Sequence, residues 1–186
     1  MNAGEIKAFR ESVNAVSSKI KSMTTDFVQY KHLDFLEKDV ETSGKMAFRD
    51  PDMLSWEYKK PYNYSIVFKG GKISINDQGK KSQMDASASK IFTKINKLIV
   101  GSVSGNLFDD KEFTISYFTN AGFNIARLIP KDAALKKYIK QVELSFDKKA
   151  ATVEQVRLLE SDEDYTKIVF KNKQINAKVD DAAFRN

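Results

Sequence analysis

Apolar residues recur every three or four positions at the start of the chain and every second position afterwards. In residues 3–20 they form one stripe of an amphipathic helix, made of Ile6, Phe9, Val13, Val16 and Ile20. Asn2, followed three residues later by Glu5, matches an N-terminal capping box. We therefore expect the chain to open with a helix over residues 3–20 that buries one face.

The period of two that follows predicts a series of β-strands. Within residues 42–49, for example, Gly44, Met46 and Phe48 alternate with small, polar or charged residues. Short connectors rich in Pro, Gly, Asn and Asp separate the segments, as hairpins require. The expected strands cover residues 24–36, 42–49, 53–59, 62–69, 72–77, 80–84, 113–119, 122–129, 137–146, 151–160 and 164–171, with a short terminal segment at 173–179.

A second helical pattern interrupts the strands after residue 86. Its apolar positions span a broad arc formed by Ile91, Phe92, Ile95, Leu98, Ile99 and Val103. The segment "GSVSGNLFDDK" then breaks regular structure and leaves Leu107 and Phe108 in a loop. Further on, "IPKDAAL" at residues 129–135 has room for one helical turn.

This order of elements predicts an α+β fold that is mainly β. An open antiparallel sheet of ten or eleven strands curls strongly. Helices with apolar faces would cover its concave side, because a large exposed apolar face is a liability. We expect one curved antiparallel sheet, an incomplete β-barrel, with helices on the concave face. A chain of 186 residues without a shift in composition predicts a single domain over residues 1–186.

Composition narrows the function classes. With 41% hydrophobic and 30% charged residues, the chain is neither a disordered tail nor a membrane span. The absence of Cys excludes disulfides, thiolate metal sites and a cysteine nucleophile. The net charge of +6 comes from dispersed Lys residues near expected strand ends. Such a charge would assist approach to an acidic partner or an anionic lipid surface. Without an RNP-like motif we expect no nucleic-acid binding.

Candidate catalytic groups are isolated along the chain. The single His32 has no Ser or Asp partner at a recognisable spacing and no metal-ligand spacing. The acidic segment "ESDEDY" lacks the Gly and the length of a calcium loop, and "GSVSG" lacks the Lys of a phosphate loop. We therefore expect no enzymatic activity, no metal and no cofactor.

The aromatic residues are concentrated in "RDPDMLSWEYKKPYNYSIVFKGGK" at residues 49–72. This stretch holds the only Trp and three of the seven Tyr. Alternation places Trp56 and Tyr58 on one strand face, and Tyr64 and Phe68 on one face of the next strand. Read residue by residue, they fit an ordinary core. Taken together they favour the wall of a cavity, because the expected sheet is larger than two short helices can fill.

Several of these residues resemble a family signature. Gly44-Lys45-Met46-Ala47-Phe48, the spacing from Pro51 to Trp56 in "PDMLSWEY", and then Pro61 and Gly71 are similar to the signature of bacterial outer-membrane lipoprotein carriers of the LolA type. Phe27 and Gln29 in "TTDFVQYK" resemble an F-x-Q strand of that family, and the last strands are also similar. The resemblance covers residues 5–184.

The resemblance implies a periplasmic, non-enzymatic carrier whose signal peptide has been removed. Its cavity would take the acyl chains of lipoproteins from an inner-membrane ABC transporter and pass them to an outer-membrane acceptor, and the carrier would act as a monomer. A binder or sensor of another lipid, a glycolipid or a lipoprotein signal on the same scaffold is the alternative. Native mass spectrometry that identifies a co-purified lipid would discriminate between them.

Alternation and resemblance together assign the expected site. The cavity lining comprises Phe27, Met46, Phe48, Trp56, Tyr58, Tyr64, Ile66 and Phe68 from the sheet and Ile91, Phe92, Ile95, Leu98 and Ile99 from the lid. Arg49, Leu107 and Phe108 are expected to act in the lid or its gating. The family usually has Arg immediately before the Pro of this motif, where it bridges toward the lid; here Asp50 precedes Pro51.

Overall fold

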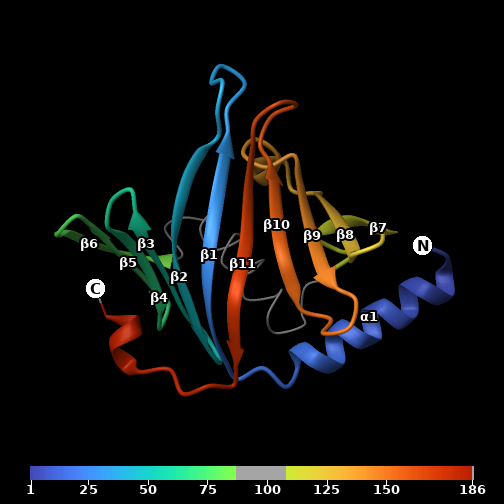
Figure 1. Ribbon diagram of the computed structural model, residues 1–186, viewed down its shortest axis with the longest axis horizontal. Helices are drawn as coiled ribbons and strands as arrows, with labels where there is room; N and C mark the ends of the chain where they lie inside the picture. The colour runs from blue at the N-terminus through green and yellow to red at the C-terminus, as the bar shows by residue number, and fades with distance from the viewer. Residues whose placement is uncertain (87–107, 186) are drawn as a thin grey trace. The chain divides into compact units, whose positions relative to one another are not determined.

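The computed structural model describes residues 1–86 and 108–185. Their eleven strands form one antiparallel sheet in the order β6-β5-β4-β3-β2-β1-β11-β10-β9-β8-β7 (Figure 1). Among the described strands, β6 and β7 are the two edges and do not pair with each other, so the sheet is not closed into a barrel. The expected class, mainly β with an open antiparallel sheet, is confirmed. The expected helix after residue 86 lies outside the described residues.

The described residues cluster into two compact units. Unit one consists of Met1–Lys19, Gln29–Glu41 and residues 108–169. Unit two consists of Ile20–Val28, residues 42–86 and residues 170–185. The long strands β1 (Ser22–His32) and β11 (Tyr165–Ile175) contribute residues to both units.

Unit one contains α1 (Ala3–Ser17) and α3 (Ala133–Lys136). Its complete strands are β7 (Phe113–Thr119), β8 (Phe123–Pro130), β9 (Gln141–Asp147) and β10 (Val153–Leu159). The expected capping box is confirmed: the Glu5 N–H donates to Asn2 Oδ1 (2.9 Å), and the Asn2 N–H donates to Glu5 Oε2 (2.7 Å). The helix ends at Ser17 and not at residue 20, because the Ser17 and Ser18 hydroxyls donate to helix carbonyls and compete with further backbone bonds.

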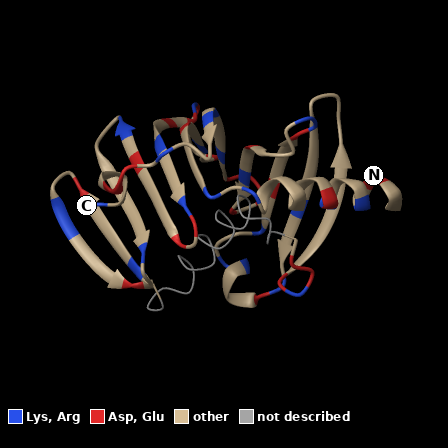
Figure 2. Cartoon of the chain, turned by 90° about the horizontal axis from the view of Figure 1, so that it is seen from below, with Lys and Arg blue, Asp and Glu red and all other residues tan. Residues whose placement is uncertain are grey.

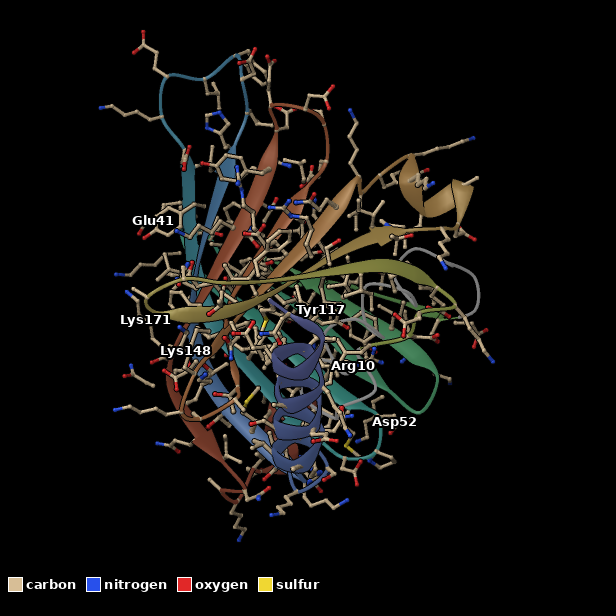
Figure 3. All side chains as sticks on the ribbon, turned by 90° about the vertical axis from the view of Figure 1, so that its right-hand side faces the viewer. Arg10, Glu41, Asp52, Tyr117, Lys148 and Lys171 are labelled. Carbon is tan, nitrogen blue, oxygen red and sulfur yellow. The ribbon has the colours of Figure 1, made fainter. Side chains whose placement is uncertain are left out.

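The apolar stripe of α1 forms the core of unit one. The Phe9 ring lies 5.1 Å from the Phe146 ring at 78° and 6.1 Å from the Tyr117 ring at 78°, both edge-to-face arrangements. Val13, one turn further on, is fully buried. Figure 3 shows Arg10 on α1 close to Tyr117 on β7. The helix is thus fixed to its sheet by interlocking aromatic rings.

Unit two contains most of β2 (Val40–Arg49) and four complete strands. These are β3 (Met53–Lys60), β4 (Tyr64–Lys69), β5 (Lys72–Asp77) and β6 (Lys80–Asp85), all joined by hairpins. The register aligns apolar residues across the strands, with Met46 opposite Trp56 and Trp56 opposite Ile66. The expected alternation therefore becomes a continuous apolar row across the unit.

Several expected boundaries are wrong. The first strand ends at His32 and not at residue 36. The expected helical turn forms as α3, and Asp132 caps it by accepting from the Leu135 N–H (2.8 Å). Because this turn occupies residues 133–136, β9 begins at residue 141 and not at residue 137.

The expected terminal strand at residues 173–179 does not form. β11 runs on to Ile175, and Asn176 then takes a left-handed conformation (φ 58°) that ends the strand. The Oδ1 atom of Asn176 accepts from the Lys21 N–H (2.7 Å), which ties this corner to the start of β1. The chain closes with a short 3₁₀ helix, η2 (Asp181–Phe184).

Charged residues of both signs are interspersed along the strands and turns of each unit (Figure 2). In unit one, for instance, Arg127 Nη2 on β8 lies 3.2 Å from Glu143 Oε2 on β9. The net positive charge is therefore spread among opposite charges.

Candidate functional site

One face of unit two carries most of the large apolar side chains that the sequence singles out. We call it the aromatic face and define it by Phe27, Met46, Phe48, Leu54, Trp56, Tyr58, Tyr64, Ile66, Phe68, Ile73 and Ile75, which the registers of β2 to β5 align and ring contacts connect. All eight residues expected to line a cavity from the sheet lie on it. Their role as a lining for acyl chains stays a prediction.

Phe27 is the centre of the aromatic face. Its ring lies 4.8 Å from the Trp56 ring and 5.1 Å from the Tyr58 ring, with both pairs edge-to-face. The ring crosses β2 at Gly44, where an added Cβ atom would lie 2.9 Å from Phe27 Cζ and 1.9 Å from the Glu57 carbonyl oxygen. The register between β2 and β3 shifts at the same place, between Ser43 and Gly44. The glycine of the sequence signature is therefore required by close packing.

Burial decreases along the aromatic face. Phe27, Phe48 and Trp56 are buried, whereas Tyr58 and Tyr64 are only partly buried. Burial, followed by the neighbouring Tyr64 and Tyr62, raises the pKa of Tyr58 to about 12. Burial and the nearby Asp77 also raise the pKa of Tyr64. Both phenols are neutral near pH 7 and can donate as well as accept hydrogen bonds.

Trp56 carries a polar group that its surroundings do not satisfy. The side chain is 5% exposed, yet its indole N–H has no hydrogen-bond partner within the described structure. A buried donor left in this state costs about 1–3 kcal/mol. The aromatic face thus offers a neutral donor inside an apolar surrounding.

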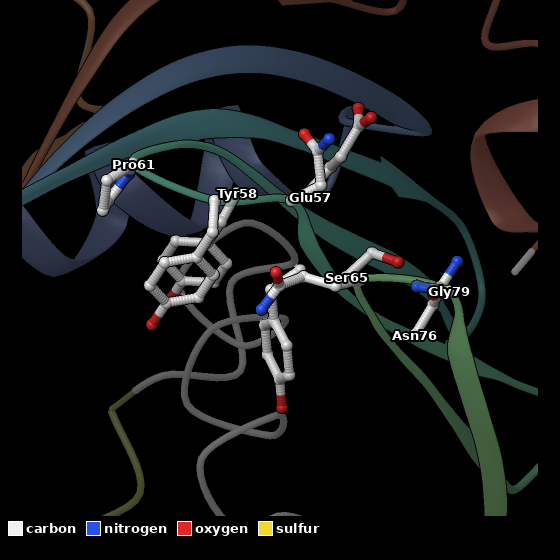
Figure 4. A pocket seen from close by; sticks show the side chains of 10 residues that line it. Glu57, Tyr58, Pro61, Ser65, Asn76 and Gly79 are labelled. Atoms are coloured by element: carbon white, nitrogen blue, oxygen red, sulfur yellow. The ribbon is translucent and has the colours of Figure 1, made fainter.

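A pocket of about 580 Å³ lies where the partly buried tyrosines end the aromatic face (Figure 4). We call it the tyrosine pocket, lined by Glu57, Tyr58, Pro61, Tyr62, Asn63, Tyr64, Ser65, Asn76, Gln78 and Gly79. Sequence reasoning missed its polar members, because they come from two separate turns. Alternate turns of an antiparallel meander lie at the same end of the sheet, and this rule would have placed "PYN" beside "DQG".

Arg49 lies on the opposite face of unit two. Its Nη2 atom is 2.6 Å from Asp181 Oδ1, and its guanidinium lies 5.1 Å from the Phe184 ring. The hydrogen bond and the charge of Arg49 lower the pKa of Asp181. On this face the C-terminal segment packs on the sheet through a cluster of Ala47, Met53, Val67, Val179, Ala183 and Phe184. Arg49 thus contacts the C-terminal segment, and its expected role in the lid or its gating stays a prediction.

Asp50, the residue that departs from the family pattern, contacts the start of β1. Its N–H donates to the Lys21 carbonyl (2.8 Å), and its carboxylate lies 3.2 Å from Lys21 Nζ. These contacts hold the β2–β3 turn against residue 21.

The remaining expected gating residues lie elsewhere. Phe108 belongs to unit one, where its ring packs 5.8 Å from both Phe9 and Tyr117. The expected lid and gating residues Ile91, Phe92, Ile95, Leu98, Ile99 and Leu107 lie outside the described residues.

His32 has structural partners in unit one. Its ring stacks on Tyr165 at 4.8 Å, and Nδ1 is 2.8 Å from Asp39 Oδ1. Within residues 1–86 and 108–185, no group of three or more His, Cys, Asp or Glu side chains is arranged to hold a metal ion.

These features define a mainly β protein built on one open antiparallel sheet, with an apolar face in unit two and a helix-covered core in unit one. The chain belongs to the outer membrane lipoprotein carrier protein LolA family, whose family model matches residues 18–186. The comparison with curated protein sequences gives no significant match.

Solved structures with the same fold have distant sequences. The MucA/MucB complex of Pseudomonas aeruginosa matches with a TM-score of 0.59 and 10% identity, over 98% of this chain and 61% of that chain. A putative outer membrane lipoprotein-sorting protein domain from Vibrio parahaemolyticus matches with a TM-score of 0.52 and 7% identity, over 98% of this chain and 97% of that chain. Lipoprotein LppX of Mycobacterium tuberculosis matches with a TM-score of 0.51 and 8% identity, over 96% of this chain and 99% of that chain.

The described helices include none with the length and apolar character needed to cross a membrane.

Proposed function

We propose that this protein is a carrier that binds the acyl chains of lipoproteins on the aromatic face of unit two. The observation that carries the proposal is the continuous apolar row across β2 to β5, from Met46 and Phe48 to Ile73 and Ile75, on one side of the sheet. Membership of the LolA family supports the same reading.

The energetics of such a face suit a carrier. Burial of each methylene contributes about 0.8 kcal/mol, so eight methylenes contribute about 6 kcal/mol before the costs of association are subtracted. The unpartnered indole N–H of Trp56 supports the proposal as well, because an ester or amide carbonyl of the ligand would satisfy it.

Membership of the family also suggests where the carrier acts and which partners it has. The carrier would act in the periplasm, receive lipoproteins from an inner-membrane ABC transporter and deliver them to an outer-membrane acceptor. It would perform no covalent chemistry, since transfer needs only a difference in affinity between open and closed states of a few kcal/mol.

A second candidate function is a sensor that binds a partner protein on the same scaffold. The TM-score of 0.59 to the MucA/MucB complex favours it, since that structure holds this fold in a complex with another protein. A sensor would hold its lipid as a signal, whereas a carrier would release it to an acceptor.

The test is binding of a triacylated lipoprotein to the purified protein, followed by co-elution in gel filtration. We expect wild-type protein to form a one-to-one complex. Ile66→Glu places a charge at a partly buried position of the aromatic face, in register with Trp56 and Ile75, and should weaken binding at least about tenfold, a loss of about 1.4 kcal/mol. Ile129→Glu on β8 is the matched control, because Ile129 is 40% exposed in unit one.

Circular dichroism of both variants would show whether each remains folded. Equal affinity of the two variants, or no complex with wild-type protein, would contradict the proposal. Release of the lipoprotein to acceptor membranes would favour the carrier over the sensor.

A further inference from the structure

The tyrosine pocket continues directly from the aromatic face. Tyr58 and Tyr64 belong to both, and their rings lie 6.0 Å apart at 56°. A ligand whose acyl chain lies along Trp56 and Ile66 would therefore extend its polar end past these two rings into the pocket. The volume of about 580 Å³ is typical of sites for small molecules.

The pocket offers neutral hydrogen-bonding groups with free capacity. The hydroxyls of Tyr62 and Tyr64 and the side-chain amide of Asn63 have no hydrogen-bond partner among the described residues. Asn76, in register with Ser65 on the other face of the sheet, uses Oδ1 to accept from the Gly79 N–H (2.9 Å). These groups can both donate and accept, as hydroxyl groups of a ligand require.

The lining of the pocket lacks the cationic side chains that bind an anionic group. Glu57 is the one charged residue among its described lining residues, and its carboxylate lies 3.4 Å from Lys59 Nζ. Asp77, paired in register with Tyr64, lies beside the pocket and has Lys80 as its register partner on β6. Phosphate sites in proteins are built from Arg, Lys or clustered backbone N–H groups, and no Arg or Lys is among these lining residues.

We propose that the tyrosine pocket binds the neutral, hydroxylated headgroup of a lipid, such as a sugar ring. The apolar C–H face of the ring packs on Tyr58 and Tyr64, and its hydroxyls bond to the Asn63 amide and to Tyr62. The inference rests on the proposed function, since the acyl chain occupies the aromatic face. It widens the cargo from lipoproteins to lipids with uncharged sugar headgroups.

The test compares two amphiphiles with one tail. Isothermal titration calorimetry measures binding of n-octyl β-D-glucoside and of n-octyl phosphate, both below their micelle concentrations, with D-glucose as the headgroup alone. We expect the glucoside to bind about tenfold more tightly than the phosphate, since two or three added hydrogen bonds of about 0.5–1.5 kcal/mol suffice. Glucose should bind at least a hundredfold more weakly than the glucoside.

Two variants test whether the tyrosine pocket causes the preference for the glucoside over the phosphate. Tyr62→Ala and Asn63→Ala should each weaken glucoside binding about fivefold and leave phosphate binding unchanged. Tyr138→Ala is the matched control, because Tyr62 is 51% exposed and Tyr138, in unit one, is 55% exposed. Both tyrosines lie outside the core, so the folded state is retained.

The outcomes separate the two proposals. If both amphiphiles bind wild-type protein equally, or the phosphate binds more tightly, the headgroup site is wrong and the acyl carrier stands. If glucose alone binds as tightly as the glucoside, the pocket takes free sugar and the lipid link is wrong. If neither amphiphile binds, the proposed function itself fails. A glucoside preference that survives Tyr62→Ala and Asn63→Ala contradicts the placement.

Discussion

The two units share the same alternating strand pattern but differ in what covers their apolar side chains. In unit one, α1 lays Phe9 and Val13 against the sheet, and the rings of Phe146, Tyr117 and Phe108 close around Phe9. In unit two, the aromatic face ends in partly buried tyrosines and a pocket, and the indole N–H of Trp56 has no partner in the described structure. The Tyr117 hydroxyl in unit one is also buried without a hydrogen-bond partner in the described structure, so the feature that marks a place for a ligand is the pocket that adjoins the aromatic face.

The largest expected effect tests the core of unit one. Phe9→Ala removes the ring at the centre of the aromatic cluster and should lower the free energy of unfolding by about 3–5 kcal/mol in urea denaturation. Phe35→Ala should change it by less than about 0.5 kcal/mol, because Phe35 is 80% exposed. Similar losses for both would mean that α1 does not form this core.

The next effect tests the close approach under the aromatic face. Gly44→Ala forces a Cβ atom against the Glu57 carbonyl, and we expect a loss of about 2–3 kcal/mol. Gly122→Ala is the matched control, since the nearest atom to its Cβ would be Asn120 Oδ1 at 3.9 Å. Equal melting temperatures for the two variants would refute the packing of Phe27 over β2.

A smaller effect tests the other face of unit two through pH. Arg49 lowers the pKa of Asp181 in the folded state, so this pair stabilises the fold above the ordinary range of an Asp carboxyl. The contribution is lost as the pH falls through the lowered pKa, and Asp181→Asn should therefore lose less stability than wild type between about pH 5 and pH 2. Unfolding midpoints across this range measure the difference.

Asp52→Asn is its control, because the exposed Asp52 has no ion pair with any described residue, and it should follow the wild-type profile. Arg49→Met should reproduce the flatter profile of Asp181→Asn. Wild-type behaviour of Arg49→Met would mean that the pair does not hold the C-terminal segment.

Local pattern was sufficient to predict most of the fold. The alternation in residues 53–59 and 72–77 and the capping box at Asn2 depend on neighbours in sequence, and the structure confirms them. The alternation also assigned Trp56 and Phe68 to one face. It could not predict that Ala47 is buried between Met46 and Phe48, because that requires cover on both faces of β2.

Long-range contacts account for what the sequence did not show. The partner of Arg49 lies at residue 181, and a four-residue 3₁₀ helix is too short to give a periodic signal. The tyrosine pocket joins turns at residues 61–63 and 78–79, whose polar residues look like ordinary turn formers in sequence. Both features depend on residues that are distant in sequence and lie close together only in the folded chain.

The most direct test of the central claim uses the only Trp in the chain. Trp56 lies on the aromatic face, so a palmitoyl ligand with bromine atoms in the middle of its chain should quench its fluorescence on contact. We expect saturable quenching by the brominated ligand and none by the unbrominated one at the same occupancy. Saturable binding of the brominated ligand without quenching of Trp56 would place the acyl chain elsewhere and contradict the account.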